Sequence, residues 1–246
     1  MSQSLIGKSA LVTGAGTGIG KGIACELARR GAKVAIHYNS SDTGAKDTQQ
    51  RIEELGGQCM IVQADIADRE QIVRMVDTAA AALGGIDILV NNAALQLNIN
   101  WFEYTEELYD RVMNVNLKGY WQCMQAVIPD MKQRNFGRII NISSVHGKRP
   151  TDFDAVYCMS KGGIKMLGRE SAIELARYGI TVNTIAPGAI DVGKFKSHKE
   201  PSRKKFPLGR VGLPEDVASL ACYIASDETS FMTGATVRLD GAGMLM

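Results

Sequence analysis

The stretch Thr13-Gly14-Ala15-Gly16-Thr17-Gly18-Ile19-Gly20 closes an apolar run that begins at Ser9 and opens a helical pattern near Lys21. Glycines at a strand-to-helix turn let the backbone approach a pyrophosphate, which the N–H groups and the dipole of the helix N-terminus then hold. The spacing is T-G-x-x-x-G-x-G, because Ile19 stands where the generic G-x-G-x-x-G would need its third glycine. An ordinary glycine-rich turn is the alternative, but the strand before it and the helix after it favour a dinucleotide site.

Outward from this turn, short apolar runs alternate with longer stretches of helical period. Seven strands are expected, at residues 9–13, 33–38, 58–65, 86–92, 137–144, 180–187 and 235–241. This alternation predicts a parallel sheet with helices on both faces. No Pro/Ser/Gly-rich linker divides the 246 residues, so we expect one doubly wound α/β domain over residues 1–246. The stretch of residues 188–213 lacks a period, and its length predicts a lid over the substrate.

The composition is that of an ordinary globular protein. Hydrophobic residues make up 45% and charged residues 22%, which disfavours disordered, collagen-like and coiled-coil chains. A net charge of +2 is too small to argue for a polyanion partner along the whole chain. Five scattered cysteines without a CxxC pair favour free thiols in a reducing compartment. With no secretion signal and no apolar run of about 20 residues, the sequence predicts a cytoplasmic protein without a membrane or nucleic-acid partner.

The end of the second strand should discriminate NAD from NADP. An acidic side chain would bind the ribose 2'-hydroxyl there, but the chain reads Tyr38-Asn39-Ser40-Ser41. None of these residues would repel a 2'-phosphate, and Asn39 and Ser40 offer hydrogen-bond donors to it. The sequence therefore favours NADP, with NAD as the alternative.

Two more strand ends are expected at the same edge of the sheet. Asp65 ends the third strand and could accept a hydrogen bond from an adenine amino group, or could instead cap the helix expected to start near Asp68. Asn92 and Ala93 end the fourth strand, where an open α/β sheet presents its carboxyl edge to a ligand.

Tyr157 and Lys161 are four residues apart in a helical pattern, so their side chains share one face of the helix. An ammonium group there would favour the phenolate and lower the pKa of Tyr157, which would make the tyrosine an acid/base. Taken alone, such a pair is more often a solvated helix face.

Together these motifs resemble the short-chain dehydrogenase/reductase family, from Gly7 to Gly241. The resemblance rests on TGAGTGIG at 13–20, Asp65, NNAA at 91–94, Asn116 within NVNLKG, Ser144, Tyr157-x-x-x-Lys161 and Pro187-Gly188. The strings ISSVH, SKGG and PGAI are most similar to the glucose (aldose) dehydrogenase branch, and the 3-oxoacyl reductase branch shares the scaffold. The gap between Tyr157 and Lys161 is unlike the longer gap of enoyl reductases.

The resemblance implies a strand order of 3-2-1-4-5-6-7, a nicotinamide cofactor and, commonly, a homotetramer. It also implies roles for four residues: Tyr157 as the acid/base, Ser144 as hydrogen-bond partner of the substrate oxygen, Lys161 as holder of the nicotinamide ribose, and Asn116 as anchor of a water. Ser143 competes with Ser144, which stands thirteen residues before Tyr157, the family's usual interval. The expected cofactor contacts are Gly14, Gly16, Thr17, Gly18, Ile19, Gly20, Tyr38, Asn39, Ser40, Asp65, Ile66, Asn92, Ala93, Tyr157, Lys161, Pro187, Gly188 and Ile190.

The substrate end is less determined. A threonine that often follows Pro187-Gly188 in the family is replaced by Ala189-Ile190-Asp191, and Asp191 could accept a hydrogen bond from the nicotinamide carboxamide or simply cap the lid. His146 could contact substrate, or could be a loop imidazole bonded to backbone. Residues 194–205 hold six Lys/Arg and one acid, which indicates either a solvated loop or cations for an anionic substrate, with Lys194, Lys196 and Arg203 as candidates.

The predicted function is an NAD(P)-dependent oxidoreductase that acts on a hydroxyl or carbonyl group of a small polar substrate, a sugar or sugar derivative first. A 3-oxoacyl or general ketone reductase is the alternative, and a nucleotide-binding protein without catalysis is a remote one. A third reading of residues 194–205 is local polyanion binding. No metal site is expected.

Overall fold

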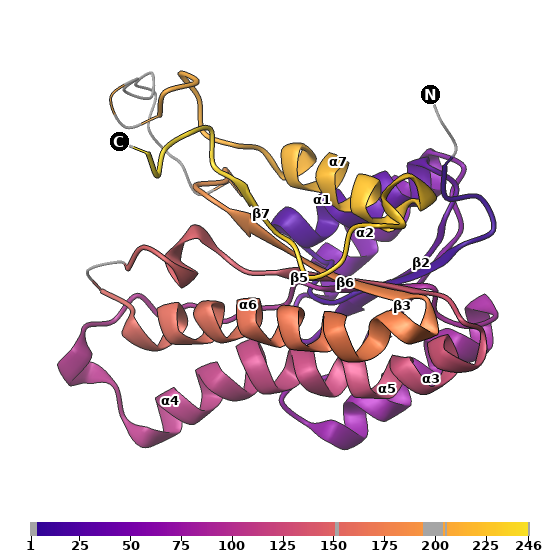
Figure 1. Ribbon diagram of the computed structural model, residues 1–246, viewed down its shortest axis with the longest axis horizontal. Helices are drawn as coiled ribbons and strands as arrows, with labels where there is room; N and C mark the ends of the chain where they lie inside the picture. The colour runs from indigo at the N-terminus through magenta and orange to yellow at the C-terminus, as the bar shows by residue number, and fades with distance from the viewer. Residues whose placement is uncertain (1–3, 151–152, 194–203, 205, 246) are drawn as a thin grey trace.

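The computed structural model describes residues 4–150, 153–193, 204 and 206–245. Its centre is a seven-stranded parallel sheet in the order β3-β2-β1-β4-β5-β6-β7 (Figure 1), which confirms the predicted topology. The strands are β1 Ser9–Val12, β2 Lys33–Tyr38, β3 Cys59–Gln63, β4 Ile88–Asn91, β5 Gly137–Ile142, β6 Ile180–Pro187 and β7 Thr236–Leu239.

Helices cover both faces of the sheet. On one face lie α1 Gly18–Arg29, α2 Asp42–Glu54 and α7 Pro214–Ala225, and on the other lie α3 Arg69–Leu83, α4 Glu106–Met113, α5 Gly119–Gln133 and α6 Ala155–Leu175 (Figure 1). A π-helical turn at Asn114–Lys118 joins α4 to α5. Short 3-10 turns occur at Trp101–Glu103, Val145–Gly147, Ala176–Tyr178 and Asp227–Thr229. No helix in the described ranges is long and apolar enough to cross a membrane.

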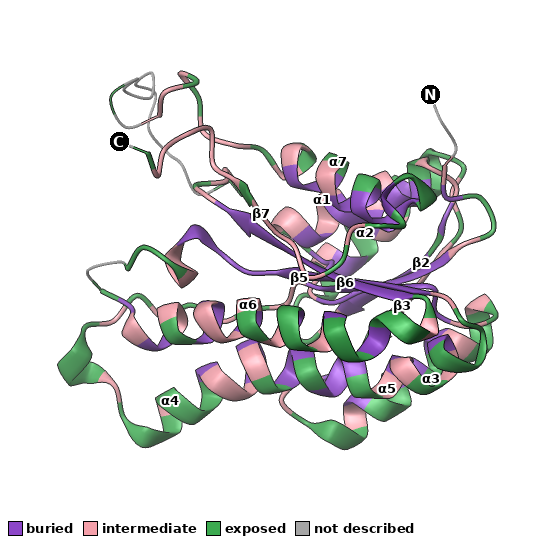
Figure 2. Ribbon diagram, in the orientation of Figure 1, coloured by how far each residue is buried: buried purple, intermediate pink, exposed green. Residues whose placement is uncertain are grey.

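The apolar strands explain this two-sided arrangement. The residues of β1, β4, β5 and β6 are buried throughout (Figure 2), as expected for strands that are covered on both faces. Alternate strand residues enter two separate cores: Val12 packs toward Ile23 and Val217, whereas Leu11 packs toward Ile72 and Val127. The sheet therefore separates two hydrophobic cores, each of which is covered by a layer of helices.

The strand order reverses at β1. Strand β2 pairs with one edge of β1, and β4 pairs with the other edge. In open α/β sheets, ligands bind beyond the carboxyl ends of the strands at such a switch point. The strands are shorter here than predicted. Thr13, Asn92 and Ser144 follow strand ends and so belong to the loops at this edge.

The segment between β6 and α7 contains one parallel bridge, Ile190 to Gly212, in its described part. Asp191 N–H donates to the Gly212 carbonyl at 2.8 Å, and Gly212 N–H donates to the Ala189 carbonyl at 3.0 Å. The two ends of the expected lid are thus joined beside the carboxyl end of β6.

Candidate active site

The glycine-rich turn is held against the end of β4. Gly14 and Gly18 have positive φ angles of 64° and 55°, which L residues with side chains rarely adopt. A Cβ on Gly14 would stand 2.8 Å from Ala93 Cα, and a Cβ on Gly20 would stand 2.2 Å from the Gly14 carbonyl oxygen. Asn92 Nδ2 closes the arrangement by donating to the Thr13 carbonyl at 2.9 Å. The turn therefore has room for backbone alone.

The N-terminus of α1 suits an anion. Thr17 stands at the N-cap but makes no capping hydrogen bond through its side chain among the described residues, and the first turn contains no acidic residue. Its N–H groups and the positive end of the helix dipole are available to a phosphate. The glycine cradle and this uncapped helix would fit the pyrophosphate of a dinucleotide, and the contacts predicted for residues 13–20 stay a prediction.

His37 on β2 supports the turn from behind. Gly14 N–H donates to His37 Nδ1 at 3.0 Å, and His37 Nε2 lies 3.0 Å from the Ala64 carbonyl oxygen. These two bonds require a neutral imidazole with its proton on Nε2. Burial lowers the pKa of His37 below its usual value, consistent with that state. No sequence pattern indicated this role of His37, because 23 residues separate it from Gly14.

The predicted 2' end of the site holds a side-chain cluster that was also missed. Tyr38 hydrogen-bonds Asp42 in the first turn of α2, and the Asp42 carboxylate pairs with Lys46 at 2.7 Å. The Asn39 carbonyl accepts from Gln63 Nε2 at 2.9 Å. A carboxylate and a cation therefore both stand beside Tyr38, although residues 38–41 contain neither.

Asp65 does not cap α3. That role belongs to Asp68, whose carboxylate accepts from the N–H groups of Glu70 and Gln71. Asp65 instead accepts from Ala67 N–H at 2.9 Å and pairs with Arg111 at 2.8 Å. The capping alternative for Asp65 is therefore wrong, and its predicted contact with adenine stays a prediction, as does that of the adjacent Ile66.

The other end of the site brings Ser144, Tyr157 and Lys161 together. Asp154 caps α6 and starts the helix that carries Tyr157 and Lys161. Ser144 follows β5, accepts a hydrogen bond from His146 N–H at 3.1 Å, and hydrogen-bonds the Tyr157 side chain. The competing Ser143 donates its hydroxyl proton to the Lys161 carbonyl at 2.7 Å. The geometry thus brings Ser144, not Ser143, to the tyrosine.

Lys161 is buried beneath the tyrosine. The residue is 2% exposed, and its Nζ donates a hydrogen bond to the Ile142 carbonyl at 2.9 Å. Nζ also lies 5.5 Å from the ring centres of both Tyr120 and Tyr157. Burial lowers the pKa of Lys161 to about 7. This lysine is therefore only partly charged near neutral pH.

The prediction that Lys161 lowers the pKa of Tyr157 is wrong for this structure. Burial raises the pKa of Tyr157, the hydrogen bond from Ser144 opposes that increase, and the nearby charge of Asp154 adds to it. The physical reason is that the phenol itself is buried, and burial is the largest effect on its pKa.

Asn116 lies in the π-helical turn and is fully buried. Its Oδ1 accepts from Leu95 N–H at 2.7 Å, and its Nδ2 donates to the Leu95 carbonyl at 2.8 Å and to Ser160 Oγ at 3.1 Å. The amide group therefore joins the chain after β4 to α6. The predicted water stays a prediction.

Tyr120 is a site neighbour that no sequence pattern indicated. It is fully buried on α5, and its hydroxyl donates to the Ile142 carbonyl at 3.2 Å, the acceptor that Lys161 also uses. Burial raises its pKa well above the usual value, so this hydroxyl stays protonated.

The predicted substrate contacts are only partly described. His146 Nδ1 lies 3.1 Å from the Arg149 carbonyl oxygen, which favours the interpretation of a loop imidazole bonded to backbone. Asp191 Oδ1 accepts from Gly193 N–H at 2.8 Å, a turn at the start of the expected lid. Lys194, Lys196 and Arg203 lie outside the described residues. Gly188, a predicted cofactor contact, is held at the end of β6 by a bond from its N–H to the Leu239 carbonyl at 2.9 Å.

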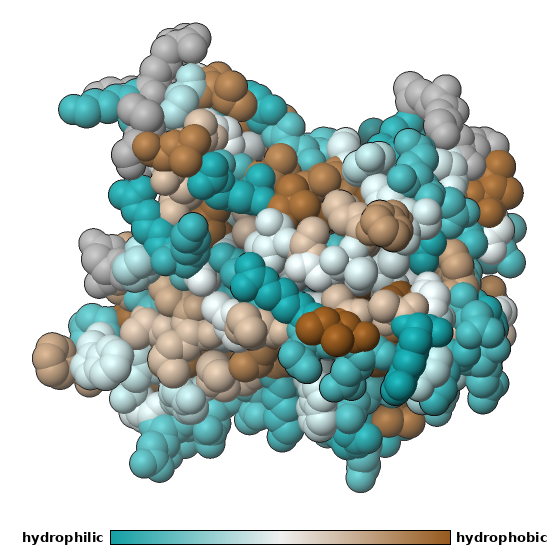
Figure 3. Space-filling model, viewed as in Figure 1, coloured by the Kyte–Doolittle hydropathy of each residue, from teal (hydrophilic) through white to brown (hydrophobic). Residues whose placement is uncertain are grey.

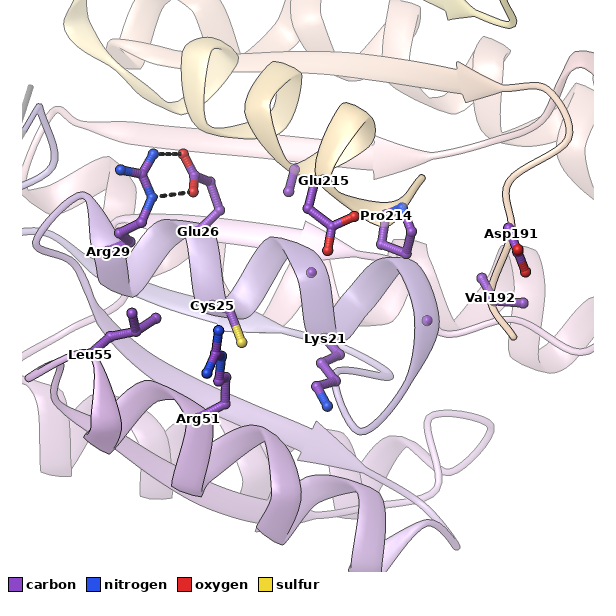
Figure 4. A pocket seen from close by; sticks show the side chains of 13 residues that line it. Lys21, Cys25, Glu26, Arg29, Arg51, Leu55, Asp191, Val192, Pro214 and Glu215 are labelled. Carbon is purple, nitrogen blue, oxygen red and sulfur yellow. Dashed lines mark hydrogen bonds and ion pairs between the residues drawn. The ribbon is translucent and has the colours of Figure 1, made fainter. Parts of the chain in front are cut away.

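A pocket opens beside the glycine-rich turn, between α1, α2 and the start of α7 (Figure 4). Its lining includes Gly18 of the turn and Asp191 and Val192 of the lid region, with Lys21 and Arg51 on the facing helices. Tyr157 and Lys161 do not line it. The described residues contain no group of three His, Cys, Asp or Glu side chains that could hold a metal ion.

Comparisons with known proteins agree with this geometry. A family model described as enoyl-(acyl carrier protein) reductase matches residues 14–244. Glucose 1-dehydrogenase 2 of Bacillus subtilis is 38% identical over 248 residues, which are 98% of this chain and 96% of that protein. The 3-oxoacyl-[acyl-carrier-protein] reductase of Staphylococcus aureus is 38% identical over 243 residues, which are 97% and 98% of the two chains.

Solved structures give the same result. The crystal structure of a short-chain type dehydrogenase/reductase from Mycobacterium marinum matches with a TM-score of 0.91 and 34% identity, over 99% of this chain and 98% of that one. The glucose dehydrogenase branch, suggested by ISSVH, SKGG and PGAI, and the 3-oxoacyl reductase branch thus both occur among the relatives. The chain belongs to the short-chain dehydrogenase/reductase family and is an NAD(P)-dependent oxidoreductase that acts on CH–OH groups.

Proposed function

We propose that this enzyme interconverts a hydroxyl and a carbonyl group on a small polar substrate, a sugar or sugar derivative, with NADP as the preferred cofactor. The observation that carries the proposal is the Ser144 side chain hydrogen-bonded to Tyr157 above the buried Lys161. This group stands at the same sheet edge as the glycine cradle. A nicotinamide cofactor, when bound, supplies the hydride acceptor or donor.

Proton transfer is the task of Tyr157. Its hydroxyl exchanges a proton with the substrate oxygen, and Ser144 holds both oxygens in place by hydrogen bonding. The Ser144 bond also favours the ionised tyrosine against the effect of burial. Lys161 lies within reach of the nicotinamide ribose in this proposal, and Asn116 fixes α6 at the correct distance from the chain after β4.

The cofactor preference rests on the end of β2. Residues 38–41 contain no carboxylate, and Lys46 offers a cation one helical turn beyond Asp42. Asp42 is the opposing charge, and in this proposal its pairing with Lys46 and Tyr38 reduces its repulsion of a 2'-phosphate. The Tyr38→Asp variant adds an unpaired carboxylate there, so the NADP/NAD ratio of kcat/KM should fall. A wild-type enzyme that prefers NAD would contradict the proposal.

The sugar assignment is supported by the motif strings and by the glucose dehydrogenase relative. A 3-oxoacyl reductase is the second candidate, and it is favoured by the Staphylococcus aureus relative. Turnover of a panel of aldoses, sugar acids, sugar phosphates and 3-oxoesters with each cofactor, followed by nicotinamide absorbance, separates the two. Exclusive turnover of the oxoesters would overturn the sugar assignment.

The basic stretch of residues 194–205 suggests an anionic substrate. We propose that the lid over residues 188–213 brings Lys194, Lys196 or Arg203 to it, with a charge-assisted contact of about 1.5–3 kcal/mol. KM for a sugar acid should then rise with salt more than KM for its neutral analogue. Substitution of any of the three residues by alanine should raise KM for the anionic substrate only. If KM for the sugar acid and for its neutral analogue depend equally on salt, the basic stretch is a solvated loop that does not contact substrate.

The protein is further proposed to be a cytoplasmic homotetramer. Exposed apolar side chains on α5 and α6 support assembly, and Figure 3 shows apolar side chains on the face of the molecule over these helices. The exposed apolar residues of α5 and α6 include Trp121, Met159, Met166 and Ile173, which are 42–75% exposed.

The Tyr157→Phe variant tests the central assignment. It removes the ionisable hydroxyl and keeps the ring, so the chemical step should slow by roughly 100- to 10,000-fold, while the Kd of NADP stays near its original value. A Phe variant that keeps half of the wild-type rate in a chemistry-limited assay would show that Tyr157 is not the acid/base.

A further inference from the structure

Asp154 is a buried carboxylate that the proposed mechanism does not use. The residue is 1% exposed, and it forms no ion pair with a Lys or Arg of the described residues. Burying an anion is unfavourable unless hydrogen bonds replace its water. The groups that replace water here identify what Asp154 does.

Three donors from two separate parts of the chain converge on this carboxylate. Tyr157 N–H donates to Oδ1 at 3.3 Å, which caps α6. The Tyr104 hydroxyl donates to the same oxygen at 2.5 Å, and Asn98 N–H donates to Oδ2 at 3.1 Å. Asn98 has a φ of 56°, a conformation that this bond helps to hold. Capping alone would need only the first of these contacts.

The two outer donors belong to residues 94–104, the chain between β4 and α4. This segment contains only a three-residue 3-10 turn, Trp101–Glu103, and runs beside the start of α6 at the left of Figure 1. Its beginning is held by Asn116, which bonds both Leu95 and Ser160 of α6. Asp154 is thus the second attachment of the segment to the helix that carries the acid/base.

We propose that Asp154 is a positioning residue that latches residues 94–104 to the start of α6 and places its carboxylate beside the proposed acid/base. The inference rests on the proposed role of Tyr157 only for the catalytic effect of this charge. The latch itself is a statement about geometry.

The charge has a defined sign of effect. Asp154 disfavours the Tyr157 phenolate and raises its pKa. The other titratable neighbours are Cys158 and Lys161 on α6 and Tyr120 on α5, with the Ser144 hydroxyl from the loop after β5. Asp154 is the only carboxylate among them, and its effect on the pKa of Tyr157 precedes the smaller one of Cys158 in the same direction, so its removal should ease ionisation of Tyr157.

Asp154→Asn and Tyr104→Phe separate the charge from the latch. Asparagine is as good an N-cap as aspartate, so α6 should still form. However, the amide has only one acceptor oxygen, whereas the three donors use both oxygens of the Asp154 carboxylate. Tyr104→Phe keeps the charge and removes one latch bond. Tyr109→Phe, on α4 outside the latch, is the matched control.

Two measurements do not depend on turnover. Hydrogen exchange of residues 94–104 should accelerate in Asp154→Asn and Tyr104→Phe and stay at the wild-type rate in Tyr109→Phe. Tyrosinate absorbance, taken as the difference between each protein and its Tyr157→Phe derivative, isolates the ionisation of Tyr157. Its midpoint should move to lower pH in Asp154→Asn and stay unchanged in Tyr104→Phe.

The outcomes are distinguishable. Wild-type exchange in both latch variants would overturn the latch, and an unchanged midpoint in Asp154→Asn would overturn the role of the charge. If both effects occur but Tyr157→Phe remains active, the latch stands and the proposed acid/base is wrong.

Discussion

Lys161 is a single buried cation whose proposed role in catalysis is set against the stability of the fold. A pKa lowered from 10.5 to about 7 means that burying the charged lysine lowers the free energy of unfolding by about 5 kcal/mol. This destabilisation is fully present below pH 7 and decreases as pH rises from 7 to 10.5, because in that range the folded chain has lost the proton that the unfolded chain still binds.

Lys161→Met should therefore stabilise the protein while it abolishes turnover. The lost bond to Ile142 costs about 1 kcal/mol, and the Tyr120 hydroxyl still bonds that carbonyl, so a net gain of roughly 2–4 kcal/mol is expected at pH 6. Urea unfolding at pH 6 and at pH 10 measures the gain and its decrease. Lys165→Met, on the same helix but only partly buried, is the control and should change stability little. A less stable Lys161→Met protein at pH 6 would contradict the prediction.

His37 makes the glycine-rich turn sensitive to acid. Its lowered pKa means that the unfolded chain binds a proton below about 6.5 before the folded chain does, so stability falls as pH decreases through that range. Protonation also removes the acceptor that Gly14 N–H uses. Asp65, whose charge favours the protonated ring, acts against the burial effect.

His37→Asn should flatten this pH dependence. Asparagine cannot take up a proton, so the free energy of unfolding and the affinity for NADP should vary less between pH 7 and pH 5 than in the wild type. Denaturant unfolding and calorimetric titration of NADP at both pH values measure how much the free energy of unfolding and the NADP affinity change between pH 7 and pH 5. The same changes in variant and wild type would assign the pH dependence to another group.

At the scale of elements, Gly20 controls how closely α1 approaches the sheet edge. A Cβ there would stand 2.2 Å from the Gly14 carbonyl oxygen and 2.5 Å from Asn92 Nδ2, which real side chains do not tolerate. Gly20→Ala should displace the start of α1 and raise the Kd of NADP at least about tenfold, or about 1.4 kcal/mol. Gly162→Ala, where the nearest atom is 3.6 Å away, should leave the Kd near the wild-type value.

The elements also show where sequence reasoning succeeds. The strand order and the glycine turn were predictable because each depends on a local pattern or on motifs in a fixed order. The roles of His37, Tyr120 and Asp154 were not, since their partners lie 22–56 residues away. The direction of the pKa shift of Tyr157 was predicted wrongly, because the spacing reveals that Lys161 is near but not that the phenol itself is buried.

At the scale of the whole molecule, α6 presents an apolar stripe. Met159, Met166 and Ile173 follow one another at intervals of seven residues and are 50%, 59% and 75% exposed. This spacing places them on one side of a helix. An apolar groove beside them is lined by Leu117, Trp121 and Leu167. In the proposed homotetramer, the same stripe on a second copy, related by two-fold symmetry, would pack against this surface.

Ile173→Glu should therefore reduce the oligomer without unfolding the protomer. The side chain is three-quarters exposed in the single chain, so a charge costs the protomer little, whereas in a two-fold interface it would be buried opposite its own copy. Light scattering after size-exclusion chromatography should show a tetramer for the wild type and a smaller species for Ile173→Glu. Val73→Glu, at an exposed apolar position on α3, should keep the wild-type mass. A wild-type monomer, or an Ile173→Glu protein of unchanged mass, would show that α6 does not form the interface.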